Sequence, residues 1–429
     1  MSESKSLNDK AWEQLFEKYD ILNQIDMNGS FQISATQIKE FREPRLMAKF
    51  DHTINLPKLF SANELAILPI TRGDYIISHF DAYHKFENAD TTLIKVSLPT
   101  YIQSLDYNNI TSESIALNCA IASGIIEDFT GDEQIVPTVS GRMSSGLFDF
   151  EIMNTLDKRH SDVSVANSQI EIDAAYEGIH YLSLFEAKRD LSEDFLIRQL
   201  YYPYRTWQSR IEKEVKPIFL VYSNGIYHLY QYKFENPRDY SSLVLVKQCN
   251  YTIEDTVITS QDIQELLQNL TLFPEPKISF PQADSFERVI NLCELLSEHS
   301  MNRDQVTENY AFNARQTNYY TDAARYLGLI EKTKVNGTPV YHITSKCKMI
   351  LRKRYKQRQL DFCCLILRHK VFSDVLRKYF ETGIMPLNSE IIQFMKRSNL
   401  YKVESNSTFE RRASTVRSWI EWIVCLINE

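Results

Sequence analysis

Glycine is scarce in this 429-residue chain, with 11 residues, or about 2.6% against the ~7% usual in proteins. Glycine-rich phosphate loops are therefore not expected, and neither the phosphate-loop motif nor GxGxxG occurs. The zinc-protease motif HExxH and the nucleophile elbow GxSxG are missing as well. These absences remove the usual sequence anchors for motor ATPases, dinucleotide-dependent oxidoreductases and zinc proteases.

Paired cysteines are also lacking, because none of the seven cysteines has CxxC spacing to another. An odd number without a metal motif indicates buried thiols in a reducing compartment. The longest uncharged stretch at a helix signal, residues 114–126, is too short to span a bilayer. The first 20 residues are charged and amphipathic, unlike a signal peptide. We expect a cytoplasmic protein without membrane contact.

Net positive charge is missing from the whole chain but present at one end. The chain has 48 basic and 56 acidic residues, a net charge of −8. Residues 281–429 hold 23 basic and 16 acidic residues, net +7, which leaves 25 − 40 = −15 for residues 1–280. A basic end domain on an acidic body indicates nucleic-acid binding, since phosphate contacts need only local positive charge. A solvated basic surface is the alternative.

Three segments differ in pattern. Residues 1–105 read as helices followed by a strand pair, which is compatible with a winged-helix or other recognition domain. Residues 106–275 alternate a helix at 112–129 with strands at 147–153, 169–176 and 181–188. A helix capped by Ser192 follows, which Pro203 should end or kink. After a proline-rich linker at 273–281, residues 281–429 are mostly helical.

The central segment places two carboxylates and an ammonium at strand ends. Asp173 lies in one apolar strand, and Glu186 and Lys188 end the next, on one face by alternation. Carboxylates suit Mg²⁺, which takes one or two of them with waters and substrate phosphate. A lysine beside the metal can orient or deprotonate the attacking water. ExK occurs four times in the chain, and only this copy ends an apolar strand that follows an acid.

This arrangement resembles the PD-(D/E)xK nuclease superfamily. The texts IEIDA at 170–174 and EAK at 186–188, with GRMSSG at 141–146 and RQLYYPYR at 198–205, are similar to one group of bacterial type II restriction endonucleases. The motif departs from the pattern at Ile172, where the superfamily has proline. The resemblance implies Mg²⁺-dependent hydrolysis of phosphodiester bonds in double-stranded DNA. It implies Asp173 and Glu186 as metal ligands and Lys188 at the water.

Ligands of one ion must lie close together, which constrains the strand register. A two-residue turn at 177–178 would pair Asp173 with Leu182, leaving Glu186 ~13 Å away. A loop of about four residues, 178–181, pairs Asp173 with Glu186 instead. We therefore predict the longer loop, or an equivalent bulge near 174–175.

Other polar residues of the central segment are candidates for the site. Glu113 can help to hold metal, although an exposed helix-start glutamate is the alternative. Glu171 shares strand parity with Asp173 and can be a second acid. Candidates for DNA-backbone contacts are Arg142, in a loop of small residues, and the helix residues Arg198 and Arg205.

The basic segment reads as a winged helix. Helices at 303–309 and 314–327 precede strands at 329–333 and 338–343, and the second helix of such a unit enters the major groove. A second unit pairs a helix at 389–396 with one at 408–428, and residues 352–358 add five cations for phosphates or a solvated face. The DNA-binding candidates here are Arg315, Gln316, Asn318, Tyr319, Arg411 and Arg412. A winged helix used for protein contacts is the alternative.

Taken together, the sequence predicts an α+β protein with a PD-(D/E)xK restriction-endonuclease-like core and helical or winged-helix domains on both sides. The expected domains are residues 1–105, 106–275 and 281–429. The expected function is a type II restriction endonuclease with Mg²⁺ as cofactor, double-stranded DNA as substrate and a cognate DNA methyltransferase as system partner. Whether it forms a homodimer stays open. The alternatives are a DNA-binding regulator without cleavage and a nuclease of repair or mobile-element biology.

Overall fold

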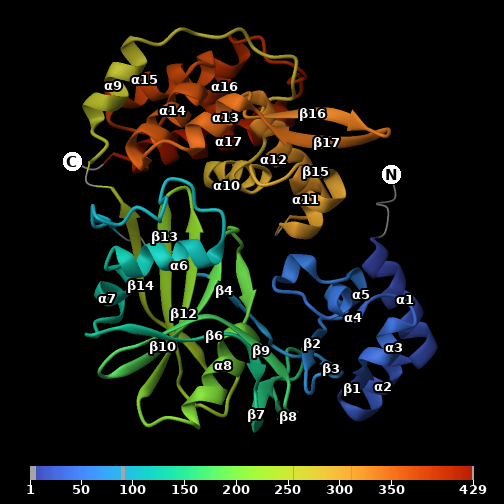
Figure 1. Ribbon diagram of the computed structural model, residues 1–429. Helices are drawn as coiled ribbons and strands as arrows, with labels where there is room; N and C mark the ends of the chain where they lie inside the picture. The colour runs from blue at the N-terminus through green and yellow to red at the C-terminus, as the bar shows by residue number, and fades with distance from the viewer. Residues whose placement is uncertain (1–5, 88–91, 255, 311, 428–429) are drawn as a thin grey trace.

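The computed structural model describes residues 6–87, 92–254, 256–310 and 312–427. The chain is mixed α+β, and its buried apolar residues form four clusters. One cluster joins residues 11–77, two cover the faces of a large sheet between residues 66 and 253, and one joins residues 258–426. Figure 1 shows the corresponding parts as a blue N-terminal part, a cyan-to-green central part and a yellow-to-red C-terminal part.

The N-terminal part packs helices on a three-stranded antiparallel sheet of order β1-β3-β2. The expected strand pair is present as β2 and β3, with a turn at residues 70–73. Two short helices lie between residues 35 and 47, and Pro44 opens the second of them because its fixed φ suits a first turn. The elements are α1 Leu7–Tyr19, α2 Ile21–Asn28, β1 Phe31–Ser34, α3 Ala35–Lys39, α4 Pro44–Met47, η1 Thr53–Asn55, α5 Lys58–Ala62, β2 Ala66–Pro69 and β3 Asp74–Ser78.

The central part is built on a seven-stranded sheet of order β5-β14-β13-β12-β10-β9-β6, in which β10 and β12 are parallel. Strand β5 belongs to this sheet, although its residues precede the expected domain boundary at 105. The elements are β4 Tyr83–Lys85, β5 Leu93–Val96, α6 Glu113–Ala122, α7 Ile125–Thr130, β6 Val136–Ser144, β7 Leu147–Met153, β8 His160–Ala166, β9 Gln169–Glu177, β10 Tyr181–Lys188, β11 Asp194–Leu196, α8 Arg198–Gln208, β12 Glu214–Ser223, β13 Ile226–Phe234 and β14 Leu243–Ile253.

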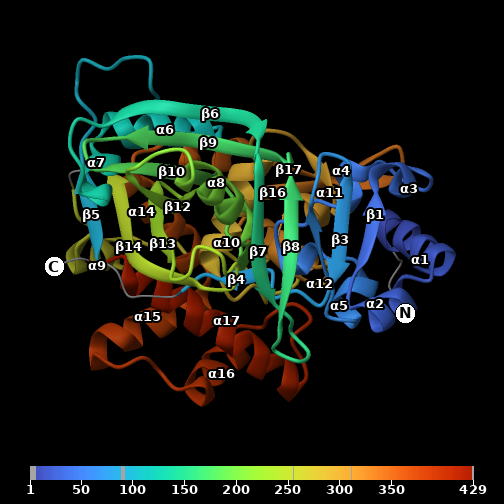
Figure 2. The ribbon, with the colours of Figure 1, turned by 90° about the horizontal axis from the view of Figure 1, so that it is seen from below.

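Helices cover both faces of this sheet (Figures 1 and 2). Along β10, Leu182 and Leu184 pack in the cluster that contains α8, whereas Phe185 and Ala187 pack in the cluster that contains α6 and α7. Alternation therefore turns Glu186 toward α8. The single helix expected at 112–129 is two helices, because Gly124 has a left-handed φ of 78° and interrupts the right-handed helix.

The helix expected from Ser192 starts later than predicted, and Pro203 does not end it. Residues 194–196 form strand β11, and α8 begins only at Arg198. The helix runs through Pro203, which is itself buried among residues 199–204. Burial of tyrosines and leucine against the sheet offsets the hydrogen bond that proline cannot make.

The register predicted for β9 and β10 is confirmed. Leu182 pairs with Glu177 and Phe185 pairs with Ala174, so residues 178–181 form the connection. The pairing ends at Phe185 and Ala174, so Glu186 and Asp173 directly follow the last paired residues of the two strands, and the Ala187 N–H donates to Asp173 Oδ2 at 2.7 Å. The two carboxylates therefore come from directly neighbouring strands at the same end of the sheet.

The C-terminal part is mostly helical and carries a small sheet of order β15-β17-β16. Its strands pair as those of the N-terminal part do, but two helices stand between its first strand and its hairpin, where the N-terminal part has α3, α4, η1 and α5. The expected elements at 303–343 are present. The elements are α9 Ser260–Gln268, α10 Phe286–Leu296, β15 Met301–Asn302, α11 Arg303–Asn309, α12 Ala314–Tyr326, β16 Ile330–Val335, β17 Thr338–Ile343, α13 Ser345–Leu351, α14 Tyr355–Leu367, α15 Lys370–Thr382, α16 Asn388–Lys396 and α17 Asn406–Cys425.

Two boundaries differ from the sequence prediction. Helix α9 packs in the C-terminal cluster through Ile263 and Leu267, although it precedes the proline-rich linker. Helix α17 begins at Asn406 rather than at residue 408, because the Ser405 hydroxyl accepts the backbone N–H of Thr408 and caps the helix.

Candidate active site

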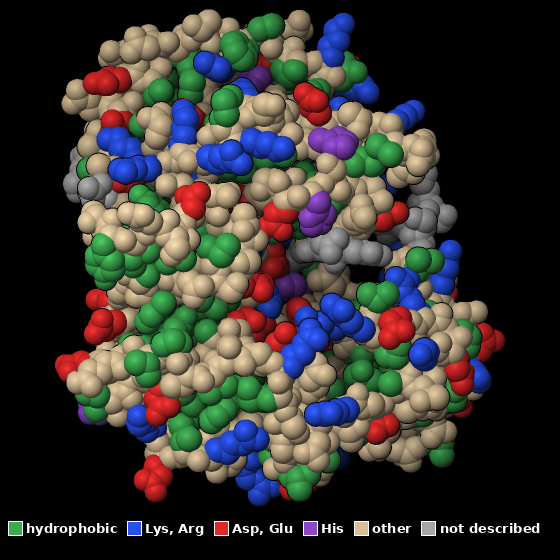
Figure 3. Space-filling model, viewed as in Figure 1, with side chains coloured by type: hydrophobic (Ala, Val, Ile, Leu, Met, Phe, Trp, Pro, Cys, Tyr) green, Lys and Arg blue, Asp and Glu red, His purple; other side chains and the backbone are tan. Residues whose placement is uncertain are grey.

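A pocket of about 550 Å³ lies at the ends of β9 and β10, where the N-terminal and central parts meet. Both parts contribute to its walls, and charged side chains dominate them. The acids are Asp51, Glu113, Glu171, Asp173 and Glu186, and the bases are Arg45, Lys49, Arg142, Lys188 and Arg198. Figure 3 shows acidic side chains near the centre of one face of the molecule, with Lys and Arg beside them.

Three of the predicted residues, Asp173, Glu186 and Lys188, are brought together at the inner end of this pocket. The Lys188 ammonium donates to Glu186 Oε1 at 2.5 Å. Gln199 Nε2, from α8, donates to the same oxygen at 2.8 Å. The backbone N–H of Ala187 donates to Asp173 Oδ2 at 2.7 Å, which holds the Asp173 side chain against β10.

Each carboxylate uses one oxygen in these bonds and keeps the other for the pocket. Within the described part of the chain, Glu186 Oε2 and Asp173 Oδ1 accept no hydrogen bond from protein. Neither is among the buried side-chain atoms that lack a partner, so both oxygens are reachable from the pocket. Two free carboxylate oxygens on adjacent strands are a suitable donor set for a hard cation.

Burial and neighbouring charges shift the pKa values of these groups in opposite directions. Burial raises the pKa of Glu186 to about 7 and raises that of Asp173, although Lys188 opposes both shifts. Burial would lower the pKa of Lys188, but the nearby carboxylates, Glu186 first, raise it above its usual value. The inner end of the pocket therefore combines mutually repelling carboxylates with the Lys188 ammonium.

Glu113 lies in the same pocket, as the sequence suggested. It is the first residue of α6, directly after the capping residue Ser112. Burial raises the pKa of its carboxyl, and the charges of Lys188 and Glu186 also act on it. Its position makes it a third acid at the site, contributed by the opposite layer of the fold.

Arg142 and Arg198 also reach the pocket. Arg142 lies on strand β6, not in a loop, and its Nε donates to Glu171 Oε1 at 3.2 Å between two exposed side chains. Arg198 opens α8, and its buried Nε has no partner within the described residues. The expected second acid Glu171 is therefore paired with an expected DNA-binding residue.

Arg205 does not line the pocket. Its guanidinium donates to the Asp149 carbonyl at 3.0 Å and to the Tyr201 hydroxyl at 2.8 Å, and it lies over the Phe148 ring. The extension of α8 through Pro203 turns this side chain toward β7. Its contacts are those of a residue that packs the helix.

Sequence reasoning missed several residues of the pocket, among them Arg45, Lys49, Asp51 and Gln199. Arg45 and Lys49 come from the N-terminal part, and no pattern in the central segment could indicate them. Gln199 stood inside the quoted text at 198–205 without a role. Only the three-dimensional contact between α8 and β10 assigns it to Glu186.

The DNA-binding candidates of the C-terminal part lie together, away from this pocket. Arg315 and Asn318 are exposed on α12, and Arg315 Nε donates to the Tyr319 hydroxyl at 2.5 Å. Gln316 caps the helix, because its side chain accepts the backbone N–H of Asn313 at 3.1 Å. Arg411 is exposed on α17, and Arg412 donates to Gln282 Oε1 at 2.7 Å.

The cations at 352–358 are largely committed to contacts within the protein. Lys353 pairs with Asp361 at 2.5 Å and Lys356 with Asp262 at 2.9 Å. Arg358 is 3% exposed and donates to the Leu351 carbonyl at 2.5 Å. This run is therefore not the free phosphate-binding surface that its composition suggested.

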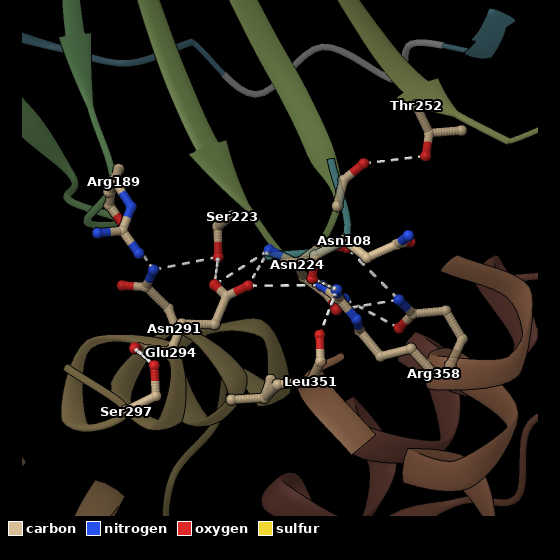
Figure 4. A network of polar contacts seen from close by, with 12 residues as sticks. Asn108, Arg189, Ser223, Asn224, Thr252, Asn291, Glu294, Ser297, Leu351 and Arg358 are labelled. Atoms are coloured by element: carbon tan, nitrogen blue, oxygen red, sulfur yellow. Dashed lines mark hydrogen bonds and ion pairs between the residues drawn. The ribbon is translucent and has the colours of Figure 1, made fainter. Parts of the chain in front are cut away.

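The segment that follows Lys188 is held by both flanking parts. From the C-terminal part, Asn291 Nδ2 donates to the Arg189 carbonyl at 2.7 Å and Asn291 Oδ1 accepts the Leu191 N–H at 3.1 Å (Figure 4). From the N-terminal part, His52 Nε2 lies 3.3 Å from the Asp190 carboxylate. The backbone next to the candidate site is thus fixed from two sides.

The described residues lack two further features. They contain no group of three or more His, Cys, Asp or Glu side chains arranged to hold a metal ion. Among them there is also no helix that is both long and apolar enough for a transmembrane segment.

Comparisons with known proteins give matches to families without an assigned function. No curated protein and no solved structure matches the chain significantly. Three family models, each described as a domain of unknown function, match successive parts of it. They are DUF6996 over residues 9–77, DUF6997 over residues 78–252 and DUF7226 over residues 288–428.

Proposed function

We propose that this protein is a Mg²⁺-dependent endonuclease of the PD-(D/E)xK superfamily, of the type II restriction kind, that hydrolyses phosphodiester bonds in double-stranded DNA. One observation supports this most strongly. Asp173 and Glu186 stand at the same end of neighbouring strands with Lys188, and each carboxylate keeps a free oxygen in the pocket.

The donor set fits magnesium. Mg²⁺ is usually held by one or two protein carboxylates, with waters and substrate phosphate completing its shell. Asp173 and Glu186 would hold it, and Glu113 is a further carboxylate of the same pocket. When bound, the ion would polarise the phosphate and lower the pKa of a water molecule.

The side chains of the chain itself have distinct tasks in this proposal. Gln199 and Lys188 hold Glu186 Oε1, which leaves Oε2 directed to the cation. The Ala187 N–H orients Asp173 in the same way. The Lys188 ammonium orients the attacking water and offsets the negative charge that develops on the phosphate.

The flanking parts support a DNA substrate. The C-terminal part has the order helix, strand, helix, helix and hairpin, with the first strand beside the last, which is the winged-helix layout. The N-terminal part has the same strand pairing, with more helices between its first strand and its hairpin. In the C-terminal part the second helix of that layout is α12, where Arg315 and Asn318 are exposed. Arginine and asparagine suit guanine and adenine edges, so we assign sequence reading to α12. In this proposal a DNA methyltransferase of the same specificity protects the host DNA.

Two other functions are compatible with a DNA-binding chain. A regulator without cleavage would need no free carboxylate pair, which makes the pocket the feature that favours a nuclease. A repair or mobile-element nuclease would use the same chemistry without one fixed target sequence.

The test is metal-dependent cleavage by matched variants. Wild-type protein should cut plasmid DNA with Mg²⁺ and not with a chelator. Asp173→Ala and Glu186→Ala should each lose cleavage by at least ~100-fold while still binding duplex DNA, because each removes a proposed ligand and not a DNA contact. The control Glu177→Ala, at the far end of β9, should cut normally. Undiminished cutting by either site variant would overturn the assignment.

A further inference from the structure

We infer that the N-terminal part holds the sugar-phosphate backbone of the nucleic acid at the mouth of the pocket, through Arg45 and Lys49. The inference rests on the proposed function, and it gives this part a task beyond reading bases. Both residues line the pocket that contains Asp173, Glu186 and Lys188.

The short helix that carries Arg45 is firmly anchored on its other side. Pro44 and Met47 are buried, and the Met47 carbonyl accepts the Trp12 indole N–H at 3.0 Å. The Leu46 carbonyl accepts Asn8 Nδ2 at 2.9 Å. Arg45 and Lys49, four residues apart, are both exposed. The fold therefore presents two cations from a rigid base.

The next residues lock this helix to the central part. The Phe50 carbonyl accepts the Tyr83 hydroxyl at 2.9 Å, and the Asp51 carbonyl accepts the Leu196 N–H at 2.9 Å. Thr53 donates through its backbone N–H to Asp194 Oδ1 at 3.1 Å. These bonds begin one residue after Lys49. They fix the place of both cations relative to the strand ends without any hinge between them.

Burial divides the pocket into a floor and a rim. The floor is formed by Glu186, which is buried, and by Asp173 and Lys188, which are partly exposed. The rim is formed by Arg45 and Lys49, which are exposed. Arg45 has no ion pair or side-chain hydrogen bond within the described residues, and the Lys49 ammonium is 3.7 Å from Asp51. An exposed, unpaired arginine next to acids that can hold a cation suits a phosphodiester, which takes guanidinium bonds on one oxygen and metal on another.

A nucleic acid fits this arrangement better than an acidic polypeptide. Arg142 and Arg198 add two further cations to the same walls. A backbone with a phosphate at every nucleotide can meet rim and floor together. A single carboxylate side chain carries its charge at one point, so it cannot contact the rim cations and a cation held by the floor together.

The test compares two double variants of equal charge. Arg45→Ala/Lys49→Ala removes the rim cations, and Lys10→Ala/Lys39→Ala removes two exposed cations of the same part that lie outside the pocket. Binding of a fluorescent duplex is measured in a chelator, so that nothing is cut, between 50 and 200 mM salt. The rim variant should bind about 10-fold more weakly, and its salt slope should fall by about 2, since each phosphate contact contributes ~0.9. The control should change affinity by less than about 2-fold.

The outcomes separate this inference from the proposed function. If the two double variants have equal salt slopes, Arg45 and Lys49 do not contact the phosphates. Mg²⁺-dependent cutting by wild type would then still support the proposed nuclease activity. If only the rim variant loses duplex affinity and salt slope, the phosphate contacts of Arg45 and Lys49 are supported even if wild type cuts nothing. Polyglutamate that competes as well as DNA at equal charge overturns a nucleic-acid partner. Absence of any duplex binding by wild type overturns both.

Discussion

At the residue scale, the candidate site depends on which carboxylate oxygen of Glu186 accepts hydrogen bonds from the protein. Lys188 and Gln199 both donate to Oε1. Gln199 is buried, and its own carbonyl oxygen has no partner within the described residues. Burying an amide whose oxygen has no partner costs free energy of desolvation. This cost favours a role for Gln199 in orienting Glu186.

We therefore expect Gln199→Ala to slow cleavage without abolishing DNA binding. A hydrogen bond to a charged group contributes ~1.5–3 kcal/mol, which corresponds to roughly 10- to 100-fold in rate. Gln208→Ala, at the exposed end of the same helix, should cut at the wild-type rate. Wild-type cleavage by Gln199→Ala would mean that Glu186 needs no support from α8.

A second residue-scale feature is His52, which links the N-terminal and central parts. Its Nδ1 lies 2.5 Å from the Asp194 carbonyl and its Nε2 lies 3.3 Å from the Asp190 carboxylate. Both neighbours accept hydrogen bonds, so both ring nitrogens must donate, and the imidazolium is favoured. Burial lowers the pKa of His52, but Asp190 and Asp194 raise it above the ordinary value of 6.5.

This raised pKa predicts how stability depends on pH. A group whose folded pKa exceeds its unfolded pKa stabilises the fold fully below the unfolded value, and the effect is lost as pH rises through the folded value. The difference in unfolding free energy between wild type and His52→Gln should therefore be larger at pH 5.5 than at pH 9. Denaturant unfolding at both pH values measures it, and a difference independent of pH would contradict the charged imidazolium.

At the element scale, the site depends on strand ends and on the helix that crosses between them. Much of this could be predicted from sequence: alternation placed Glu186 and Lys188 on one face, and the shared-metal requirement selected the connection at 178–181. Helix α8 could not be predicted in the same way. Ser192 predicted an earlier start of the helix and Pro203 predicted a break in it. The helix instead begins at Arg198 and continues through Pro203, because residues 199–204 are buried. Arg45, which comes from another part of the chain, had no local signal.

The turn between β12 and β13 is the element-scale link to the C-terminal part (Figure 4). Glu294 of α10 accepts the Ser223 hydroxyl at 2.9 Å and the Asn224 N–H at 3.0 Å, and it lies 3.6 Å from the buried Arg358 guanidinium. Removing the carboxylate leaves Arg358 buried and unpaired. We expect Glu294→Ala to lower the free energy of unfolding by ~3–5 kcal/mol.

A double variant separates the ion pair from simple loss of packing. Glu294→Ala/Arg358→Met should recover part of the stability, because no uncompensated charge stays buried. The exposed Glu410→Ala should change stability by less than about 0.5 kcal/mol. Denaturant unfolding provides the measurement. Additive losses in the double variant would show that the two charges do not stabilise each other.

At the scale of the whole molecule, the acidic body and basic end are compatible with a division of tasks. The net charge of residues 281–429 is +7, but the structure commits Lys353, Lys356 and Arg358 to internal contacts. The composition therefore gives the net positive charge of the C-terminal end, but it cannot tell which of its cations form contacts within the protein. Among the described residues, Arg315 on α12 has no acidic partner, and neither has the rim residue Arg45 in the acidic body.

This division predicts two kinds of binding defect. Arg315→Ala should weaken binding to the target duplex by ~1–3 kcal/mol more than to a scrambled duplex, because a base contact is sequence-specific. Lys332→Ala, on the exposed face of β16, should weaken both duplexes alike. Equal losses on both duplexes for Arg315→Ala would move base reading away from α12.

The central claim is tested most directly by digesting a sequenced plasmid and mapping every new end at nucleotide resolution. With Mg²⁺, wild-type protein should produce ends at one fixed position relative to one recurring sequence, and Lys188→Ala should produce none above background. Scattered ends would place the nuclease in repair or mobile-element biology. The absence of Mg²⁺-dependent ends from wild type, or the same ends from Lys188→Ala, would contradict the account.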